Sequence, residues 1–309
     1  MTEVSVVIPT YNRESVVVNA IRSVLSQSFQ DFEIVVVDDG SQDSTETVLK
    51  EMKDSRIIYI QHSKNLGTAQ ARNTGIKNSK GKYVAFLDSD DEWLPEKLSK
   101  QMETIGEYEQ DIIANVSGFY LFDEFGIKRK QIPKKQSSWF KHLLMGCGLG
   151  EGATLLVSKN AFEKVGWFNS SLPRYGDWEW LLRYTKSYNL TITPEPLAVV
   201  HRDTRPSAEK VELAAKRFLE LHLHDFKQFG YYGKRAIGKR YLEVAVHYYL
   251  AGDKKNGKKW LHKAISQSIF QRPGMYLRIF DAVYGTSIIP TLINFRNSRN
   301  SDVEVDSSQ

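Results

Sequence analysis

The sequence predicts an α/β fold: a mostly parallel sheet, followed by a helical C-terminal region. Three observations support this prediction. Apolar runs alternate with amphipathic helical segments over roughly the first 110 residues, which is the pattern of βαβ units. From about Ser207 the apolar residues follow helical spacing alone. The length of 309 residues suffices for one large domain and one smaller one.

The first part of the chain is expected to contain four strand–helix units. The predicted strands are Val4–Pro9, Phe32–Val37, Ile57–Ile60 and Tyr83–Leu87, all short apolar runs. The helices that follow them are predicted over residues 16–26, 44–53, 67–76 and 95–108. Asp43 or Ser44 suits the cap of the second helix, and Pro95 suits the first turn of the fourth.

The middle of the chain, residues 111–200, mixes strand and helix signals. Strands are expected over 112–122 and 153–158, and residues 198–201 are expected to end a last strand. Helices are expected over 160–165 and 177–187, and residues 126–138 are expected to form a basic polar loop. We therefore predict a first domain over 1–205, a helical region over 206–296 and a disordered polar tail over 297–309.

Positive charge is concentrated in the C-terminal part. Residues 201–300 carry 19 Lys and Arg against 8 Asp and Glu, whereas residues 1–200 carry 23 and 26. Two interpretations stay open: contact with an anionic partner such as membrane lipid, or a solvated Lys-rich helical surface. No nucleic-acid-binding motif is present, so no nucleic acid is expected as a partner.

The expected location is the cytoplasm. The chain has one cysteine, Cys147, which excludes an intrachain disulfide. No signal-peptide pattern and no run of 18 uncharged apolar residues is present. A peripheral position on the inner face of the cell membrane is compatible with the basic helices and with the apolar and basic stretch Met275–Phe295. Packing of that stretch against the first domain is an equal alternative.

The most informative segment is Asp88-Ser89-Asp90-Asp91, which follows the buried strand Tyr83–Leu87. Carboxylates at the end of a buried strand are costly unless a cation lies near them. Hard divalent cations take oxygen ligands and share them with substrate phosphates. Because ligands bind at the C-terminal ends of the strands in open α/β sheets, this segment predicts a metal–diphosphate site.

Four further motifs accompany the aspartate segment: Pro9-Thr10-Tyr11-Asn12-Arg13, Val37-Asp38-Asp39-Gly40-Ser41, Gly67-Thr68-Ala69-Gln70-Ala71-Arg72-Asn73 and Tyr175-Gly176-Asp177-Trp178-Glu179-Trp180. In this order, they resemble the inverting glycosyltransferases of family 2, over about residues 1–205. The resemblance implies a Rossmann-like, mostly parallel sheet of the GT-A type and a nucleotide-diphospho-sugar donor. It does not extend to the helical C-terminal region.

The resemblance assigns donor-binding roles to residues of the first three motifs. Thr10 and Tyr11 are expected to line the nucleotide cleft, and Asp38 and Asp39 to hold the base or ribose. One of these two aspartates alternatively forms only an Asp-Gly turn and helix cap. Arg72 is expected to face the nucleotide or the acidic cluster, with an internal salt bridge to Asp38, Asp39 or Asp88 as a compatible alternative.

The aspartate segment is expected to bind the donor diphosphate through Mn²⁺ or Mg²⁺. The resemblance places Asp88 on the ribose side and Asp90 on the metal, and Asp91 could share either role. Capping of the helix that begins near Pro95 is the structural alternative for these aspartates. His201 could ligate the metal or contact phosphate, and Arg202 could bind phosphate with its guanidinium.

Asp177 is the expected catalytic base. Inverting transfer needs one carboxylate to take the proton of the acceptor hydroxyl. Glu179 is the rival base, and a helix N-cap is the structural alternative for Asp177. Trp178 and Trp180 are expected to supply apolar walls and a platform for a sugar ring. Gly176 occupies the position at which the family usually has Glu. This difference puts in doubt the role that the Glu has in the family, but not the assignment of Asp177 as the base.

These residues predict an inverting, metal-dependent glycosyltransferase of the hexosyltransferase type. The expected donor is a UDP-sugar, and the expected acceptor is a glycan or lipid-linked precursor of cell-surface polysaccharide. The alternative is an inactive module that binds a nucleotide sugar or scaffolds a glycan-assembly complex. A dinucleotide-dependent oxidoreductase is excluded, because the first strand runs into Pro9-Thr10-Tyr11-Asn12-Arg13 without the required glycines.

Overall fold

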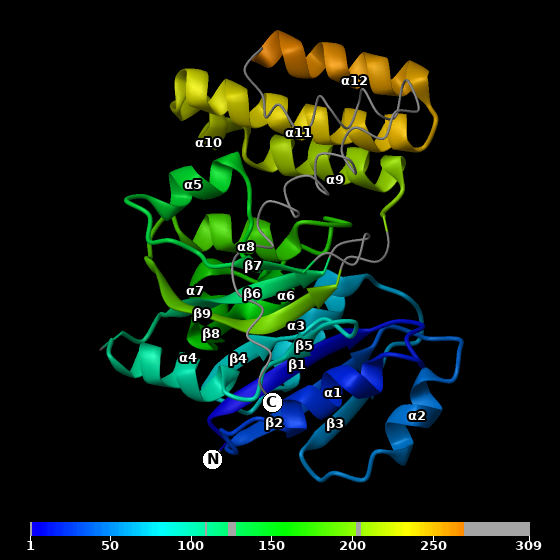
Figure 1. Cartoon of the computed structure of the whole chain (residues 1–309), viewed down its shortest axis with the longest axis vertical. Coiled ribbons are helices and arrows are strands. Elements are labelled where there is room, and N and C mark those ends of the chain that lie inside the picture. The colour runs from blue at the N-terminus through cyan, green and yellow to red at the C-terminus, as the bar shows by residue number, and fades with distance from the viewer. Residues whose placement is uncertain (1, 109, 123–127, 202–204, 269–309) are drawn as a thin grey trace, which may run out of the picture. The chain divides into compact units, whose positions relative to one another are not determined.

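The structure of the chain is a computed structural model that describes residues 2–108, 110–122, 128–201 and 205–268 (Figure 1). The chain divides into two compact units, Met1–Arg205 and Pro206–Gln309. The stretch Met275–Phe295, the tail 297–309 and Arg202 lie outside the described residues.

A nine-stranded sheet forms the centre of the first unit, in the order β3-β2-β1-β4-β8-β6-β9-β5, with β7 paired to β6. The strands are β1 (Val4–Thr10), β2 (Phe32–Asp38), β3 (Ile57–Gln61), β4 (Tyr83–Phe86), β5 (Glu92–Trp93), β6 (Ala114–Phe122), β7 (Lys128–Gln131), β8 (Leu155–Ser158) and β9 (Leu190–His201). The neighbours β3, β2, β1 and β4 run parallel, as do β6 and β9. The predicted α/β class with a mostly parallel sheet is confirmed.

Helices cover both faces of this sheet. They are α1 (Val17–Leu25), α2 (Thr45–Glu51), α3 (Thr68–Asn78), α4 (Lys97–Gly106), α5 (Trp139–Met145), α6 (Glu151–Thr154), α7 (Asn160–Val165) and α8 (Gly176–Tyr184). On one face, apolar residues of α1, α2 and α4 share one hydrophobic core with Val4, Val6 and Ile8 of β1. On the other face α3 lies so close to β1 that a Cβ at Gly75 would meet Val7 Cγ1 at 2.3 Å.

This packing brings the C-terminal ends of β1, β2 and β4 to the same edge of the sheet. Thr10 at the end of β1 pairs with Asp38 at the end of β2, and Val7 of β1 pairs with Phe86 at the end of β4. The chain after each of these strands therefore opens toward one region, where ligands of such sheets bind.

The second unit is helical among its described residues. Its helices are α9 (Ala208–Leu221), α10 (Leu223–Gln228), α11 (Gly230–Leu250) and α12 (Lys254–Gln267). Figure 1 shows α9, α11 and α12 lying side by side, and Val211, Val244 and Trp260 meet in their core. None of the helices in the described part of the chain combines the length and apolar content needed to cross a bilayer.

Several elements differ from the sequence-based expectation. The segment predicted as a basic loop contains β7, whose four residues are all exposed and polar and therefore show no apolar alternation. The strand predicted over 153–158 starts at Leu155, because Ala153 and Thr154 close α6. The two-residue β5 was not predicted, and α4 begins at Lys97 rather than at Pro95.

Candidate active site

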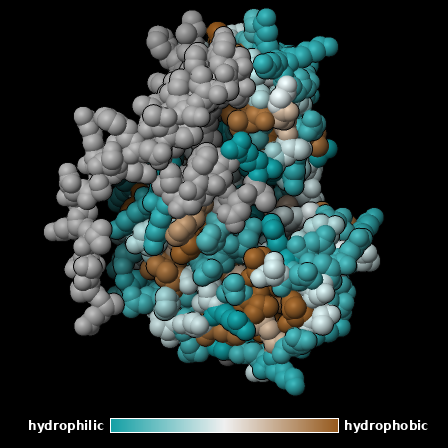
Figure 2. Space-filling model, turned by 45° about the vertical axis from the view of Figure 1, so that its right-hand side comes forward, coloured by the Kyte–Doolittle hydropathy of each residue, from teal (hydrophilic) through white to brown (hydrophobic). Residues whose placement is uncertain are grey.

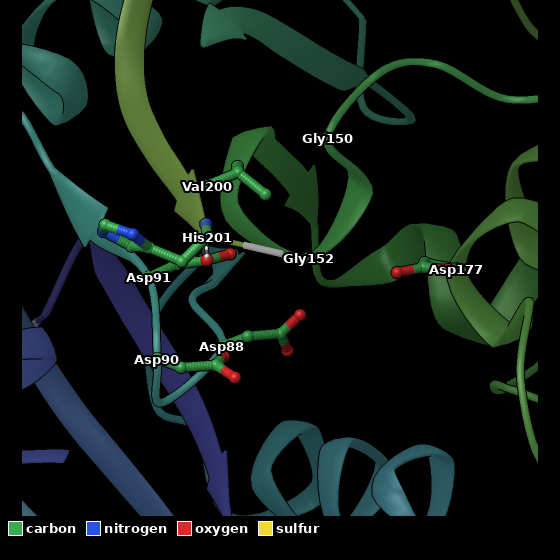
Figure 3. Close-up of a pocket in the computed structure, with 8 residues that line it drawn as sticks. All are labelled: Asp88, Asp90, Asp91, Gly150, Gly152, Asp177, Val200 and His201. Atoms are coloured by element: carbon green, nitrogen blue, oxygen red, sulfur yellow. Dashed lines mark hydrogen bonds between the residues drawn. The ribbon is translucent and has the colours of Figure 1, made fainter. Parts of the chain in front are cut away.

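An open pocket of about 250 Å³ lies at the C-terminal edge of the sheet (Figure 3). It is lined by Asp88, Asp90, Asp91, Gly150, Gly152, Asp177, Val200 and His201. The first three aspartates come from the turn after β4, Asp177 from the first turn of α8, and His201 from the end of β9. The carboxylates of Asp88 and Asp177 face each other across this pocket in Figure 3.

The buried guanidinium of Arg72 joins these two carboxylates. Its Nη2 donates to Asp88 Oδ1 at 2.6 Å and its Nη1 donates to Asp177 Oδ2 at 3.1 Å. Burial alone lowers the pKa of Arg72, but the carboxylates of Asp88 and Asp177 outweigh that effect and raise the pKa above its usual value. Of the three predicted salt-bridge partners, the structure pairs Arg72 with Asp88, and it adds Asp177.

Gly152 of α6 lies against this ion-paired group. A Cβ at position 152 would be 2.2 Å from Asp88 Oδ2 and 2.7 Å from Arg72 Nη2, which is closer than van der Waals contact allows. The absence of a side chain there lets α6 close one side of the pocket. Sequence reasoning did not identify Gly152, because the close approach comes from tertiary packing and not from a local motif.

Asp90 forms an ion pair with Arg13, which follows β1. Arg13 Nη2 lies 3.1 Å from Asp90 Oδ2, and both side chains are partly exposed. The backbone N–H of Arg13 donates to Thr45 Oγ1 of α2, which ties the loop after β1 to the loop after β2. Arg13 was part of a quoted motif but was not predicted as a site residue.

Asp91 and His201 are linked by a backbone hydrogen bond. The His201 N–H donates to Asp91 Oδ1 at 2.9 Å, so Asp91 anchors the end of β9. Burial, together with the neighbouring Asp88 carboxylate, raises the pKa of Asp91 well above its usual value. The His201 ring stacks on Phe122 and points away from Asp88 and Asp177 in Figure 3, an orientation that does not favour metal ligation.

The predicted nucleoside residues meet at the ends of β1 and β2. Asp38 accepts hydrogen bonds from the Ser41 N–H at 2.8 Å and from the Tyr59 hydroxyl at 2.8 Å. Asp39 is buried, and its two oxygens accept from the Leu66 and Gly67 backbone N–H groups just before α3. Asp39 thus ties the end of β2 to the loop before α3, whereas the local turn bond to Ser41 is made by Asp38.

Thr10 and Tyr11 differ in their exposure. Thr10 is 3% exposed, and its buried hydroxyl has no hydrogen-bond partner in the described part of the structure. Tyr11 is 41% exposed at the same edge. A buried orphan hydroxyl beside an exposed aromatic ring suits a site that a ligand completes. The nucleoside-binding role of these two residues stays a prediction.

At the start of α8, Asp177 and Glu179 point to different surroundings. Asp177 lines the pocket, whereas Glu179 is 2% exposed and pairs with Arg183 at 2.8 Å. Only Asp177 therefore has access to a ligand in that pocket. The N-cap of α8 is Tyr175, in the left-handed conformation with φ of 68°, so the N-cap alternative for Asp177 is wrong.

The two tryptophans expected as a sugar platform are buried. Trp178 is 3% exposed and donates its indole N–H to the Leu143 carbonyl at 2.8 Å. Trp180 is fully buried and donates to the Gly166 carbonyl at 2.8 Å. These indoles fix α8 in the core, and this placement corrects the expectation that they stack on a sugar.

The donor set fits a divalent cation that takes most of its ligands from substrate. Within the described residues no group of three or more His, Cys, Asp or Glu converges on one point. Mg²⁺ is commonly bound by one or two carboxylates together with substrate phosphates, so Asp88 and Asp90 in one pocket suffice for such a site. The capping alternative for these aspartates is wrong, because the α4 N-cap is Glu96 and accepts no side-chain cap bond.

Solved structures show that this is a glycosyltransferase fold of the GT-A type. The chain matches the structure of Staphylococcus aureus TarS 1–349 with a TM-score of 0.57 and 18% identity, covering 87% of this chain and 93% of that one. The structure of S. aureus TarS 1–349 in complex with UDP-GlcNAc gives a TM-score of 0.56 and 17% identity, covering 85% of this chain and 92% of that one.

The model of the Glycosyl transferase family 2 matches residues 5–166, which is more than half of the chain, so the chain belongs to that family. This confirms the resemblance stated from the five motifs. An uncharacterized glycosyltransferase of Rickettsia prowazekii is 33% identical over 192 residues, covering 60% of this chain and 57% of the relative.

A second relative carries a specific name. It is the Escherichia coli protein WfaP, named as a UDP-Glc:alpha-D-GlcNAc-diphosphoundecaprenol beta-1,3-glucosyltransferase, which is 39% identical over 130 residues, covering 41% of this chain and 50% of WfaP. The chain thus spans only about half the length of these curated relatives.

Proposed function

We propose that this chain is an inverting, metal-dependent glycosyltransferase that moves a hexosyl group from a UDP-sugar to a glycan or lipid-linked acceptor of cell-surface polysaccharide. The main support for the proposal is a pair of hydrogen bonds donated by Arg72. One goes to Asp88, on the proposed donor side, and the other to Asp177, the proposed base, and both carboxylates line the same pocket. The names of WfaP and of the TarS complex support a UDP-sugar as donor.

The reaction would be a single displacement. The oxygen of the acceptor hydroxyl attacks the anomeric carbon from the face opposite the diphosphate, and the bond from that carbon to the diphosphate oxygen breaks. Asp177 takes the hydroxyl proton as the new bond forms. Arg72 holds the Asp177 carboxylate in place through the 3.1 Å hydrogen bond, so that the base is oriented before the acceptor arrives.

Asp90, with Asp88 or Asp91 as a second ligand, would hold Mn²⁺ or Mg²⁺, whose charge offsets the charge that develops on the departing diphosphate. Thr10, Tyr11 and Asp38 would contact the nucleoside at the ends of β1 and β2. Arg13 is placed to bind phosphate if Asp90 turns toward the cation, because a guanidinium suits phosphate oxygens.

Calorimetry with a panel of nucleotide sugars, with and without Mn²⁺, tests the donor and the metal. We expect one UDP-sugar to bind in a Mn²⁺-dependent manner, and we expect Asp90→Asn to lose that binding. Asp31→Asn, which removes an exposed carboxylate at the other end of the sheet, should bind as the wild type does. Donor binding without any turnover would instead support the inactive-module alternative.

We also propose a peripheral contact with an anionic membrane surface through α12. Lys254, Lys255, Lys258, Lys259, His262 and Lys263 are all exposed on this helix, which contains no Asp or Glu. Gly257, Trp260 and Ala264 form its buried side. Figure 2 shows that hydrophilic residues predominate on the face of the molecule that it draws, with smaller hydrophobic areas between them.

Such a cationic helix face suits the inner leaflet of the cell membrane, whose anionic lipids attract polybasic segments. Sedimentation with vesicles tests this proposal. The wild type should bind vesicles that contain anionic lipid, and the fourfold Lys→Gln variant at positions 254, 255, 258 and 259 should bind less. A Lys210→Gln, Lys227→Gln control should bind nearly as the wild type does. Equal binding to neutral vesicles, or unchanged binding by the fourfold variant, would contradict this contact.

A further inference from the structure

A lysine lies fully buried in the first turn of α4. Lys97 has no exposed surface, its Nζ lies 2.5 Å from Gln101 Oε1, and it lies 3.9 Å from the ring centroid of Trp93. Burial lowers the pKa of Lys97 well below its usual value. A buried amine reduces stability unless it has a compensating role, and its function here is not explained by the chemistry of the pocket.

Lys97 determines the direction of the Gln101 side-chain amide. A lysine Nζ that donates to Gln101 requires the amide oxygen Oε1 to face it. The amide nitrogen Nε2 then points the other way, where it donates to the Thr154 carbonyl at 2.9 Å and to Asn115 Oδ1 at 2.7 Å. Without the lysine, the amide would lose the partner of its oxygen, and only the two bonds of Nε2 would fix its direction.

The two bonds at the far end of this network hold α6. Gln101 binds the Thr154 carbonyl, and the Trp93 indole N–H donates to the adjacent Ala153 carbonyl at 2.7 Å. Gly152, the next residue of α6, lies against Asp88 and Arg72 with no room for a Cβ. A shift of α6 therefore changes the space available to the Asp88–Arg72 ion pair.

We propose that Lys97 is a positioning residue for the transferase site, and that it acts by orienting Gln101, which together with Trp93 fixes α6 against the Asp88–Arg72 pair. The catalytic part of this inference rests on the proposed transferase function; the structural part does not. Lys97 does not line the pocket, so its proposed effect passes through its neighbours and chiefly through Gln101.

Four variants test the proposal: Lys97→Met, Gln101→Met, the double variant, and Lys100→Met as a control on the same helix. Lys100 pairs with Glu96 and Glu195 at the surface. The first readout is amide hydrogen exchange of the peptide over residues 148–156, where the Ala153 and Thr154 N–H groups both donate to the Gly150 carbonyl. The second readout is kcat, measured well below the unfolding midpoint.

We expect Lys97→Met to speed amide exchange in this peptide but not in the peptides of β1 and β2. We also expect this variant to lower kcat by about tenfold, because small displacements of catalytic groups slow the reaction. The double variant should lose no more than Gln101→Met, since both changes break one chain of contacts. Lys100→Met should match the wild type in both readouts.

The proposal is overturned if Lys97→Met leaves exchange over residues 148–156 unchanged. It is also overturned if exchange rises equally across the chain, since that result indicates a general loss of stability, or if the losses of the two single variants add in the double variant. Faster local exchange in Lys97→Met, with no turnover even in the wild type, would uphold the positioning of α6 and count against the proposed transferase function instead.

Discussion

Asp88 and Asp177 are bound to the same guanidinium: Arg72 donates to Asp88 at 2.6 Å and to Asp177 at 3.1 Å. The proposed donor side and the proposed base are thus held in one geometry by one buried side chain. A planar guanidinium makes this link because its nitrogens diverge in a fixed fork, which an ammonium group lacks.

Arg72→Lys is therefore expected to lower kcat/KM by about 100-fold, since one ammonium can no longer hold both carboxylates in place. Arg56→Lys is the matched control, because Arg56 also pairs with a carboxylate, that of Asp54, outside the pocket. Initial rates with the UDP-sugar donor measure the effect. Full activity in Arg72→Lys would show that the link is dispensable.

Gly152→Ala is expected to displace Asp88 and Arg72, because its Cβ would lie 2.2 Å from Asp88 Oδ2. Activity and donor affinity should both fall by about tenfold or more. Gly176→Ala is the control, since a Cβ there would meet Ala69 Cβ at an ordinary 3.6 Å. Calorimetry with donor and rate measurements compare the two variants, and equal behaviour would count against the close approach at Gly152.

Asp177→Asn is expected to lower kcat by about 10²- to 10⁴-fold while donor affinity stays near that of the wild type, because only the proton acceptor is removed. Glu179→Gln changes the rival carboxylate, which is buried against Arg183. It should affect the thermal unfolding midpoint more than kcat. A larger loss of kcat in Glu179→Gln than in Asp177→Asn would reverse the assignment of the base.

The lowered pKa of Lys97 predicts a specific pH dependence of stability. Between that lowered value and the ordinary 10.5, the unfolded chain binds more protons at this residue than the folded chain does. The contribution of Lys97 to the free energy of unfolding therefore rises with pH across this window.

Lys97→Met removes this contribution. The advantage of the variant over the wild type in unfolding midpoint should be largest at the low-pH end of this window and should decline as the pH rises toward 10.5. Thermal melts at a series of pH values measure the difference. A difference that stays constant with pH would mean that Lys97 is charged in the folded state.

The sequence was most informative where the physics is local. Short apolar runs located β1, β2 and β4, because these strands are buried along their whole length, and the helical spacing of apolar residues located α1. The aspartates after β4 were identifiable for a similar reason, since charged residues that follow apolar runs lie at the ends of buried elements. Asp177 follows no apolar run, and it was identified through the resemblance to the family.

The remaining features depend on contacts between distant segments. Gly152 is important because α6 meets Asp88 and Arg72, and the Trp178 indole is tied to α5 through the Leu143 carbonyl. The exposed polar strand β7 and the two-residue β5 have no apolar period of their own. Their positions follow from pairing with β6 and β9, which a local pattern does not encode.

The most direct test of the central claim is the stereochemistry of the product. The chain would be incubated with an α-linked UDP-sugar, a lipid-linked acceptor and Mn²⁺, and the new linkage would be assigned from its anomeric proton coupling. We predict a β-linked product with release of UDP, and no product from Asp177→Asn. An α-linked product, or turnover that persists in Asp177→Asn, would contradict a single displacement with Asp177 as the base.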